Sequence, residues 1–242
     1  MCTVTFLPLQ NKILLTSNRD EQTLRAAALL PEAYELNSGK ILFPKDGQAG
    51  GTWVAMHNNG NAMVLLNGAF QKHKHNPPYR MSRGLVFLEI LDSELPIVSF
   101  ENIDLENIEP FTLVIWQQGK LFDARWDGKD KSIIPLPVNV PHIWSSVTLY
   151  DAEVVALRKA WFDRWLHDTN YKTAESIRQF HEFGGDGDEK INLKMNRAGK
   201  LQTLSITGIE ITPYKAIMHY KDFLGGLISV NEWYITGLLQ KS

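Results

Sequence analysis

The sequence predicts an α+β fold in which antiparallel sheets and helices form separate layers. Short apolar runs are separated by tight-turn residues, and other segments carry apolar residues at helical spacing. These two kinds of segment are grouped along the chain as strands, helix, strands, two helices and strands, whereas a parallel α/β sheet would alternate them. The 242 residues contain no repeat and no long linker, so we expect a single domain spanning residues 1–242.

The first quarter of the chain is expected to form strands joined by short turns. A polar turn at residues 10–12 separates two apolar runs and indicates a hairpin, and Asn59-Gly60 marks a second tight turn. A third hairpin turns at residues 117–120. The apolar runs predicted as strands are Val4–Leu7, Ile13–Thr16, Ile41–Pro44, Trp53–Met56, Ala62–Leu66, Phe111–Trp116, Leu121–Trp126, Leu201–Ile211 and Tyr214–Tyr220.

Three segments have helical patterns with capping residues. Ser82 is the predicted N-cap of a helix over Arg83–Leu91, with its leucines on the buried face. Asp151 is expected to cap a helix that continues to about His167, in which apolar residues, including two tryptophans, recur at helical spacing. The third helix is predicted over Thr173–Phe183 and ends at a glycine pair.

Composition and charge exclude several classes of protein. Hydrophobic residues make up 44% of the chain and charged residues 21%, which is typical of globular domains. A net charge of -2 argues against binding to nucleic acid by bulk charge. The chain has no apolar run long enough to span a membrane, no signal-peptide pattern and one cysteine. We therefore expect a cytoplasmic protein without a disulfide.

The lone cysteine, Cys2, becomes the first residue when Met1 is removed. Its thiol and its own α-amine then belong to one residue. Because the α-amine has a pKa of roughly 8, it can accept the thiol proton near neutral pH. Cys2 is thus a candidate nucleophile that carries its own base, although an ordinary small apolar residue at this position remains an alternative.

Two further polar motifs follow predicted strands. Asn18, Arg19, Asp20 and Glu21 come directly after the second strand, and the hairpin register brings them beside Cys2. A guanidinium at Arg19 would favour the thiolate, while Asp20 could accept a hydrogen bond from the α-amine. A turn or helix cap is the alternative interpretation of this run. Asn67 ends a later strand and is a candidate oxyanion donor, and a strand-ending turn is its alternative.

These motifs together resemble the NRDE family, also called the transport and Golgi organisation 2 family. The resemblance rests on Met1-Cys2-Thr3, Asn18-Arg19-Asp20-Glu21, Gly50-Gly51-Thr52-Trp53, Leu66-Asn67 and Arg80-Met81-Ser82-Arg83-Gly84-Leu85. The N-terminal arrangement is also similar to choloylglycine hydrolases and penicillin V acylases. This resemblance implies a four-layer αββα sandwich of the N-terminal-nucleophile hydrolases. It also implies hydrolysis of a linear amide through a thioester.

Residue roles follow from the same resemblance. It implies that Cys2 is the nucleophile, that Arg19 and Asp20 tune it, and that Asn67 with backbone N–H groups holds the oxyanion. The residues expected to contact the substrate are Asn18, Trp53 and Ser146. The sequence departs from the acylases in two places. Arg19 and Asp20 are adjacent, so they should point to opposite faces of a strand. Ser146 stands where an Asn is expected before the long helix, which removes a second amide donor.

The predicted function is therefore that of an N-terminal cysteine amidohydrolase acting on an apolar acyl compound. The reaction as predicted needs no metal and no organic cofactor, and the expected partner is a small amide or acyl ligand. The alternative is a lipid- or haem-binding protein on the same fold, because the family is associated with such trafficking and a thiolate can ligate haem iron. Neither His73 and His75 nor the acidic loop at 184–189 has the spacing of a metal site, and both are expected to be solvated loops.

Overall fold

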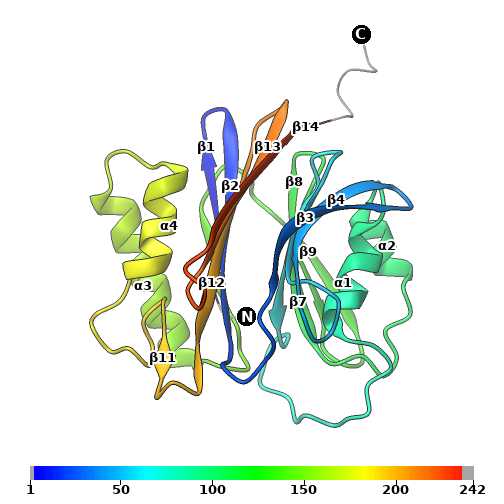
Figure 1. The fold of residues 1–242 in the computed structure, drawn as a ribbon, viewed down its shortest axis with the longest axis horizontal. Coiled ribbons are helices and arrows are strands. Elements are labelled where there is room, and N and C mark those ends of the chain that lie inside the picture. The colour runs from blue at the N-terminus through cyan, green and yellow to red at the C-terminus, as the bar shows by residue number, and fades with distance from the viewer. Residues whose placement is uncertain (1–2, 236–242) are drawn as a thin grey trace.

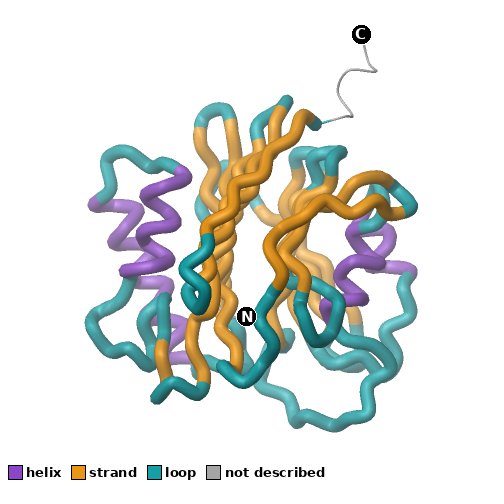
Figure 2. The backbone as a smooth tube through the Cα atoms, viewed as in Figure 1, coloured by secondary structure: helices purple, strands orange, loops and turns teal. Residues whose placement is uncertain are grey.

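Two antiparallel sheets pack face to face, and a pair of helices covers the outer face of each (Figures 1 and 2). The computed structural model describes residues 3–235. The helices lie on the two outer sides and the sheets lie between them, which confirms the four-layer αββα sandwich expected from the sequence. The sheet strands are antiparallel to their neighbours throughout, both in hairpins such as β1–β2 and in pairs that are distant in the chain, such as β1–β10 and β2–β12.

The first sheet has its N-terminal hairpin near the centre. Its order is β10-β1-β2-β12-β13-β14, with β11 paired to β12. Strands from both ends of the chain therefore lie side by side. The bounds are β1 Thr3–Leu9, β2 Lys12–Gln22, β10 His142–Ser145, β11 Asn196–Arg197, β12 Leu201–Ile211, β13 Lys215–Asp222 and β14 Ile228–Tyr234.

The second sheet is a meander in which each strand pairs with the next in sequence. Its order is β3-β4-β5-β6-β7-β8-β9. Consecutive pairing follows from the tight turns, such as the one between β5 and β6 at Asn59-Gly60. The bounds are β3 Leu29–Leu36, β4 Gly39–Lys45, β5 Val54–His57, β6 Ala62–Asn67, β7 Phe111–Gln117, β8 Lys120–Trp126 and β9 Lys131–Leu136.

Two helices begin after the capping residues that the sequence predicts, Ser82 and Asp151, and a third begins after Thr173, which was expected to be its first residue. The Ser82 side chain caps α1 (Arg83–Leu91), Asp151 caps α3 (Ala152–Asp168) and Thr173 caps α4 (Ala174–Phe183). Each cap side chain accepts a backbone N–H of the first turn, which stabilises the helix start by about 1 kcal/mol. The remaining helix, α2 (Pro96–Asn102), has a proline at its first position and no side-chain cap.

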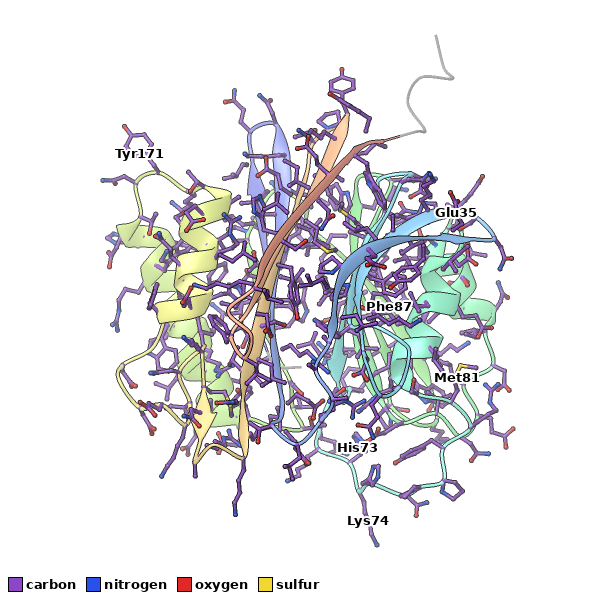
Figure 3. All side chains as sticks on the ribbon, viewed as in Figure 1. Glu35, His73, Lys74, Met81, Phe87 and Tyr171 are labelled. Carbon is purple, nitrogen blue, oxygen red and sulfur yellow. The ribbon has the colours of Figure 1, made fainter. Side chains whose placement is uncertain are left out.

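The buried face of α1 differs from the prediction. The helix buries Val86, Phe87, Ile90 and Leu91, whereas Leu85 is 38% exposed. Figure 3 shows Phe87 on the side of α1 that faces the second sheet. The apolar residues of this helix are compatible with more than one buried face at helical spacing, so the spacing alone did not identify the face that the structure buries.

Two hydrophobic cores hold the layers together. The larger core fills the space between the sheets and extends beneath α1 and α2. The smaller core lies between the first sheet and the pair α3 and α4, and it includes Leu14 with the aromatic residues Trp161, Phe162 and Phe180. Among residues 3–235, no helix is both long and apolar enough to cross a membrane.

Candidate functional site

The candidate site lies where β1 begins, between β2 and β10. Thr3 pairs with Asn18 of β2 on one side and with Ser145 of β10 on the other. The residue that precedes Thr3 in the chain is Cys2, the predicted nucleophile, which lies outside the described residues. The motif at residues 18–21 lies inside β2, which continues past the start of β1. It is therefore part of a strand, and neither a turn nor a helix cap.

Arg19 points from β2 toward the second sheet. Its side chain is 3% exposed, and Nη2 donates to Oδ2 of Asp46 at 2.9 Å. The guanidinium also lies over the Trp53 ring, 4.3 Å from the ring centroid. The Trp53 indole N–H is buried and has no hydrogen-bond partner among the described residues. Arg19 is thus a fixed, buried cation at the end of the sheet-to-sheet interface, with an unused donor beside it.

Asp46 anchors this cation and also holds a turn. Burial raises the pKa of the Asp46 carboxyl, but the hydrogen bond from Arg25 and the backbone N–H groups of Ala49 and Gln48 outweigh it, and the pKa lies below its usual range. Asp46 therefore stays ionised and keeps the Arg19 side chain in place.

Asp20 points to the opposite face of β2, toward the helices α3 and α4. One carboxylate oxygen accepts the Tyr150 hydroxyl at 2.9 Å, and the other accepts the Thr203 hydroxyl. Arg19 and Asp20 thus leave the strand on opposite sides, as their adjacency predicts. The two side chains contact different layers of the sandwich, so they do not form one pair.

Asn18 is fully buried on the helix side of β2, where it binds His181 of α4. The Asn18 amide donates to the carbonyl oxygens of His181 at 3.1 Å and Leu193 at 2.7 Å, and its carbonyl oxygen contacts His181 Nδ1. Nδ1 must donate this bond, so Nε2 accepts the Thr5 hydroxyl at 2.8 Å. Asn18 joins the sheet to α4 and lies apart from the cavity described below.

This buried histidine makes stability depend on pH. Burial, and then the Arg158 charge, lower the pKa of His181 from 6.5 to about 3. Between pH 6.5 and about 3, His181 is therefore protonated in the unfolded chain and neutral in the folded chain. Because the unfolded chain binds more protons, the free energy of unfolding falls as the pH is lowered through this range. We expect this residue to remove up to about 1.4 kcal/mol per pH unit in that window. Urea midpoints measured from pH 7.5 to pH 4.5 test this.

The matched variants are His181→Gln, which removes the titrating group, and His167→Gln on an exposed histidine of α3. The His181→Gln protein should lose less stability between pH 6.5 and 4.5 than the wild type does. The His167→Gln protein should follow the wild type. Equal pH slopes for the wild type and His181→Gln would show that His181 is not held neutral by the fold.

A second buried cation supports the start of β1. Arg158 of α3 is 0% exposed, donates to the carbonyl oxygens of Ile191 and Asn192, and binds the Thr3 hydroxyl. Its guanidinium stacks on Tyr150, 3.7 Å from the ring centroid, and Tyr150 in turn donates to Asp20. Within residues 3–235, no carboxylate forms an ion pair with Arg158. The arginine thus ties α3 to the strand that follows Cys2.

The predicted oxyanion donor, Asn67, lines a cavity of about 190 Å³ at the end of β6. Ser145 and Ser146 line the same cavity, and Ser145 pairs with Thr3 of β1. The Asn67 carboxamide has no hydrogen-bond partner in the described part of the chain. The Ser146 hydroxyl donates to the Asn67 backbone carbonyl at 2.8 Å and lies 2.9 Å from the Thr148 hydroxyl, so it helps to position Asn67.

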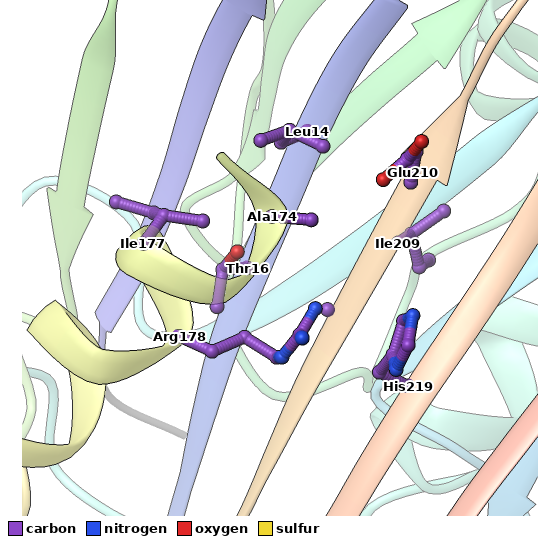
Figure 4. A pocket seen from close by; sticks show the side chains of 9 residues that line it. Leu14, Thr16, Ala174, Ile177, Arg178, Ile209, Glu210 and His219 are labelled. Carbon is purple, nitrogen blue, oxygen red and sulfur yellow. The ribbon is translucent and has the colours of Figure 1, made fainter. Parts of the chain in front are cut away.

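Other candidate sites are less suitable. The hollow between α4 and the first sheet, lined by residues that include Arg178 and His219, has no room for a water molecule (Figure 4). Ser38, His57 and Asp92 form a cluster, but His57 Nδ1 accepts the Asn59 N–H, so Nε2 carries the proton and cannot act as a base toward Ser38.

The loop histidines are held by an ion-pair cluster. His73 and His75 both contact Glu109, which also pairs with Arg83 at 3.0 Å. Figure 3 shows His73 and Lys74 on the loop that follows β6, at the edge of the molecule. Among the described residues, no group of three or more side chains is arranged to hold a metal ion.

Sequence reasoning missed the partners that fix the candidate site. Asp46, Tyr150 and Thr203 contact Arg19 or Asp20 from distant parts of the chain. Arg158 lies on the buried face of α3 with Trp161 and Phe162. A charged residue at a position where the helical spacing predicts burial was the signal that could have identified it.

Solved structures of two hydrolases have a fold similar to that of this chain. A mutant of the conjugated bile acid hydrolase from Clostridium perfringens is 12% identical with a TM-score of 0.61, over 96% of this chain and 92% of that chain. A second variant of that enzyme is 11% identical with a TM-score of 0.60, over 96% of each chain. The ortholog of N-acylethanolamine-hydrolyzing acid amidase from Caenorhabditis elegans is 11% identical with a TM-score of 0.57, over 86% and 92%.

Identities this low establish a likeness of fold alone. Among curated protein sequences, none matches this chain. The family model described as Transport and Golgi organisation 2 matches residues 1–202, which is most of the chain. The protein therefore belongs to the Transport and Golgi organisation 2 family.

Proposed function

We propose that the protein is an N-terminal cysteine amidohydrolase that cleaves a linear C–N amide bond of an apolar acyl compound. The observation that carries the proposal is the cavity lined by both Asn67 and Ser145. Ser145 pairs with Thr3, the residue that follows Cys2, and the Asn67 carboxamide has no hydrogen-bond partner within residues 3–235. A nucleophile, an oxyanion donor and room for an acyl group are thus expected at one end of the sandwich.

The described strands show which side chains lie near the start of β1. Thr3 pairs with Asn18, and the next residue of β2 is Arg19. Val4 and Phe6 face the core between the sheets, and we propose that the Cys2 thiol reacts on this side. Arg19 faces that side as well, where its charge would favour the thiolate.

The proposed reaction has two steps. The Cys2 sulfur attacks the amide carbonyl as the α-amine takes the thiol proton. The tetrahedral oxyanion, held by Asn67, collapses: the C–N bond breaks, and the amine leaves with the proton from the α-ammonium. Water then attacks the thioester, the α-amine accepts its proton, and the carboxylic acid departs as the thiol is restored. Asp20 and Arg158 act as positioning residues behind the strand.

Removal of the oxyanion donor should slow this reaction strongly. We expect Asn67→Ala to lower kcat by about 100- to 1,000-fold with a small change in KM, because the carboxamide acts on charge that develops after binding. Steady-state hydrolysis of an N-acyl amide measures this. Asn102→Ala, on the exposed end of α2, serves as the control. An Asn67→Ala enzyme that keeps wild-type kcat would remove Asn67 from the mechanism.

The size of the cavity favours an amidase over a haem or long-chain lipid carrier. Sites for drug-sized ligands occupy about 300–1,000 Å³. The cavity beside Asn67 has about 190 Å³, which suits a smaller acyl group. A titration with haem that showed saturable binding and no released amine would favour the carrier.

The requirement for an unblocked amine gives the sharpest test. A chain with a short N-terminal extension should be inactive, because residue 2 then lacks its α-amine. Cutting the extension with a site-specific protease so that Cys2 becomes the first residue should restore hydrolysis of an N-acyl amide. The control is the same cut on Cys2→Ala, which should stay inactive. Activity before the cut that equals activity after it would refute the proposed base.

A further inference from the structure

The cavity beside Asn67 has an apolar part of its wall that an acyl group could contact. This part consists of Leu66 of β6, Ile143 and Trp144 of β10, Val147 before α3, and Val155 in the first turn of α3. These residues come from both sheets and from one helix and its preceding loop. A volume of about 190 Å³ holds roughly six water-sized groups at about 30 Å³ each.

The largest wall residue is held rigidly. The Trp144 indole N–H donates to Asp123 Oδ2 at 2.9 Å, and its ring lies against His142, with centroids 5.7 Å apart. A tryptophan fixed both by a hydrogen bond and by ring packing cannot swing aside without losing both contacts. Trp144 is therefore a fixed part of the cavity wall.

The charged residue in the wall is already neutralised. Arg125 binds Asp123 through two hydrogen bonds of 2.7 Å, one to each carboxylate oxygen, and donates a third to the Ala69 carbonyl at 2.9 Å. A bidentate pair of this kind leaves little charge to attract an anion. A carboxylate or phosphate on the ligand would gain no partner here.

We propose that the cavity takes a short, uncharged acyl group of at most about six carbon atoms, with Trp144 as the residue that sets the limit. This specificity rests on the proposed function, in which the acyl carbonyl lies at Asn67. It predicts an amide substrate far smaller than a long-chain fatty amide. The polar atoms of the ligand lie at the Asn67 end, and its hydrocarbon end faces Trp144, Val147 and Val155.

Binding of unreacted amides tests the inference without requiring turnover. Cys2→Ala protein is titrated with N-methyl amides of two, four, six and ten acyl carbons, and Kd is measured by NMR. Each methylene that enters an apolar cavity should tighten binding about fourfold. We expect this gain up to about six carbons and no further gain, or weaker binding, at ten. Continued tightening to ten carbons would overturn the size limit.

Two variants locate the limit. In Trp144→Ala, made in the same Cys2→Ala background, the affinity should continue to increase between six and ten acyl carbons. Trp165→Ala, a tryptophan of α3 packed in the smaller core, should leave the length preference unchanged. A length limit that persists in Trp144→Ala would overturn the role of Trp144. Because no hydrolysis is measured, failure of the amidase proposal itself shows separately, as absence of amine release by wild-type protein.

Discussion

Replacement of Cys2 by alanine is expected to lower kcat/KM for hydrolysis of a short N-acyl amide by at least about 1,000-fold. Loss of an enzyme nucleophile typically removes most of the chemistry and leaves only what binding and the oxyanion site supply. The α-amine remains in this variant, so the experiment isolates the sulfur. Release of the amine product, followed by fluorescence, is a direct measurement.

Cys2→Ser is the matched variant, because it keeps a nucleophile of similar shape with a far less acidic proton. We expect its activity to lie between that of Cys2→Ala and the wild type. Equal urea midpoints for the three proteins would show that the loss is chemical. A Cys2→Ala protein that retains wild-type turnover would contradict the assignment of the nucleophile.

Replacement of Arg158 by leucine is expected to lower the free energy of unfolding by about 3 kcal/mol, and two opposing effects decide this value. Removing a buried cation that has no carboxylate partner among the described residues relieves its desolvation. It also leaves the carbonyl oxygens of Ile191 and Asn192 and the Thr3 hydroxyl without their donor. Each unsatisfied buried group costs about 1–3 kcal/mol, so the loss prevails. Urea unfolding measures the difference.

Arg164→Leu is the control for this substitution, since Arg164 lies on the exposed side of the same helix. Its free energy of unfolding should change by less than about 0.5 kcal/mol. An Arg158→Leu protein as stable as the wild type would mean that water or backbone movement replaces the lost donor. The contacts of Arg158 between α3 and the start of β1 would then not contribute to the free energy of unfolding.

Local signals predicted most of the fold. Hairpins with polar or Asn-Gly turns form β1–β2, β5–β6 and β7–β8, and the predicted caps Ser82 and Asp151 mark two helix starts. Such signals depend on neighbours within a few residues, so sequence alone shows them.

The elements that were missed lack a local signature. Strands β3 and β14 lie at sheet edges with their apolar side chains largely exposed, and β14 includes Ile228 at 70% exposure. The short strand β10 forms because it pairs with β1, far away in sequence. Tertiary pairing decides such segments, and their own composition does not.

For the candidate site, too, the sequence predicted the local geometry and not the contacts between distant segments. The adjacency of Arg19 and Asp20 predicts opposite faces by strand geometry, and the structure has them so. Their partners Asp46, Tyr150 and Thr203 come from elements that only the fold brings near, so spacing gave no indication of them. The roles assigned to Cys2 and Asn67 stay predictions from resemblance and position.

Trapping the acyl-enzyme tests the nucleophile most directly. Wild-type protein is mixed with a short N-acyl amide, quenched in acid within the first turnovers and digested, and the N-terminal peptide is analysed by mass spectrometry. We predict a peptide that begins at Cys2, without Met1, and carries the acyl mass on its sulfur as a hydroxylamine-sensitive thioester. An N-terminal peptide that retains Met1 and stays unmodified while the amide is hydrolysed would contradict the account.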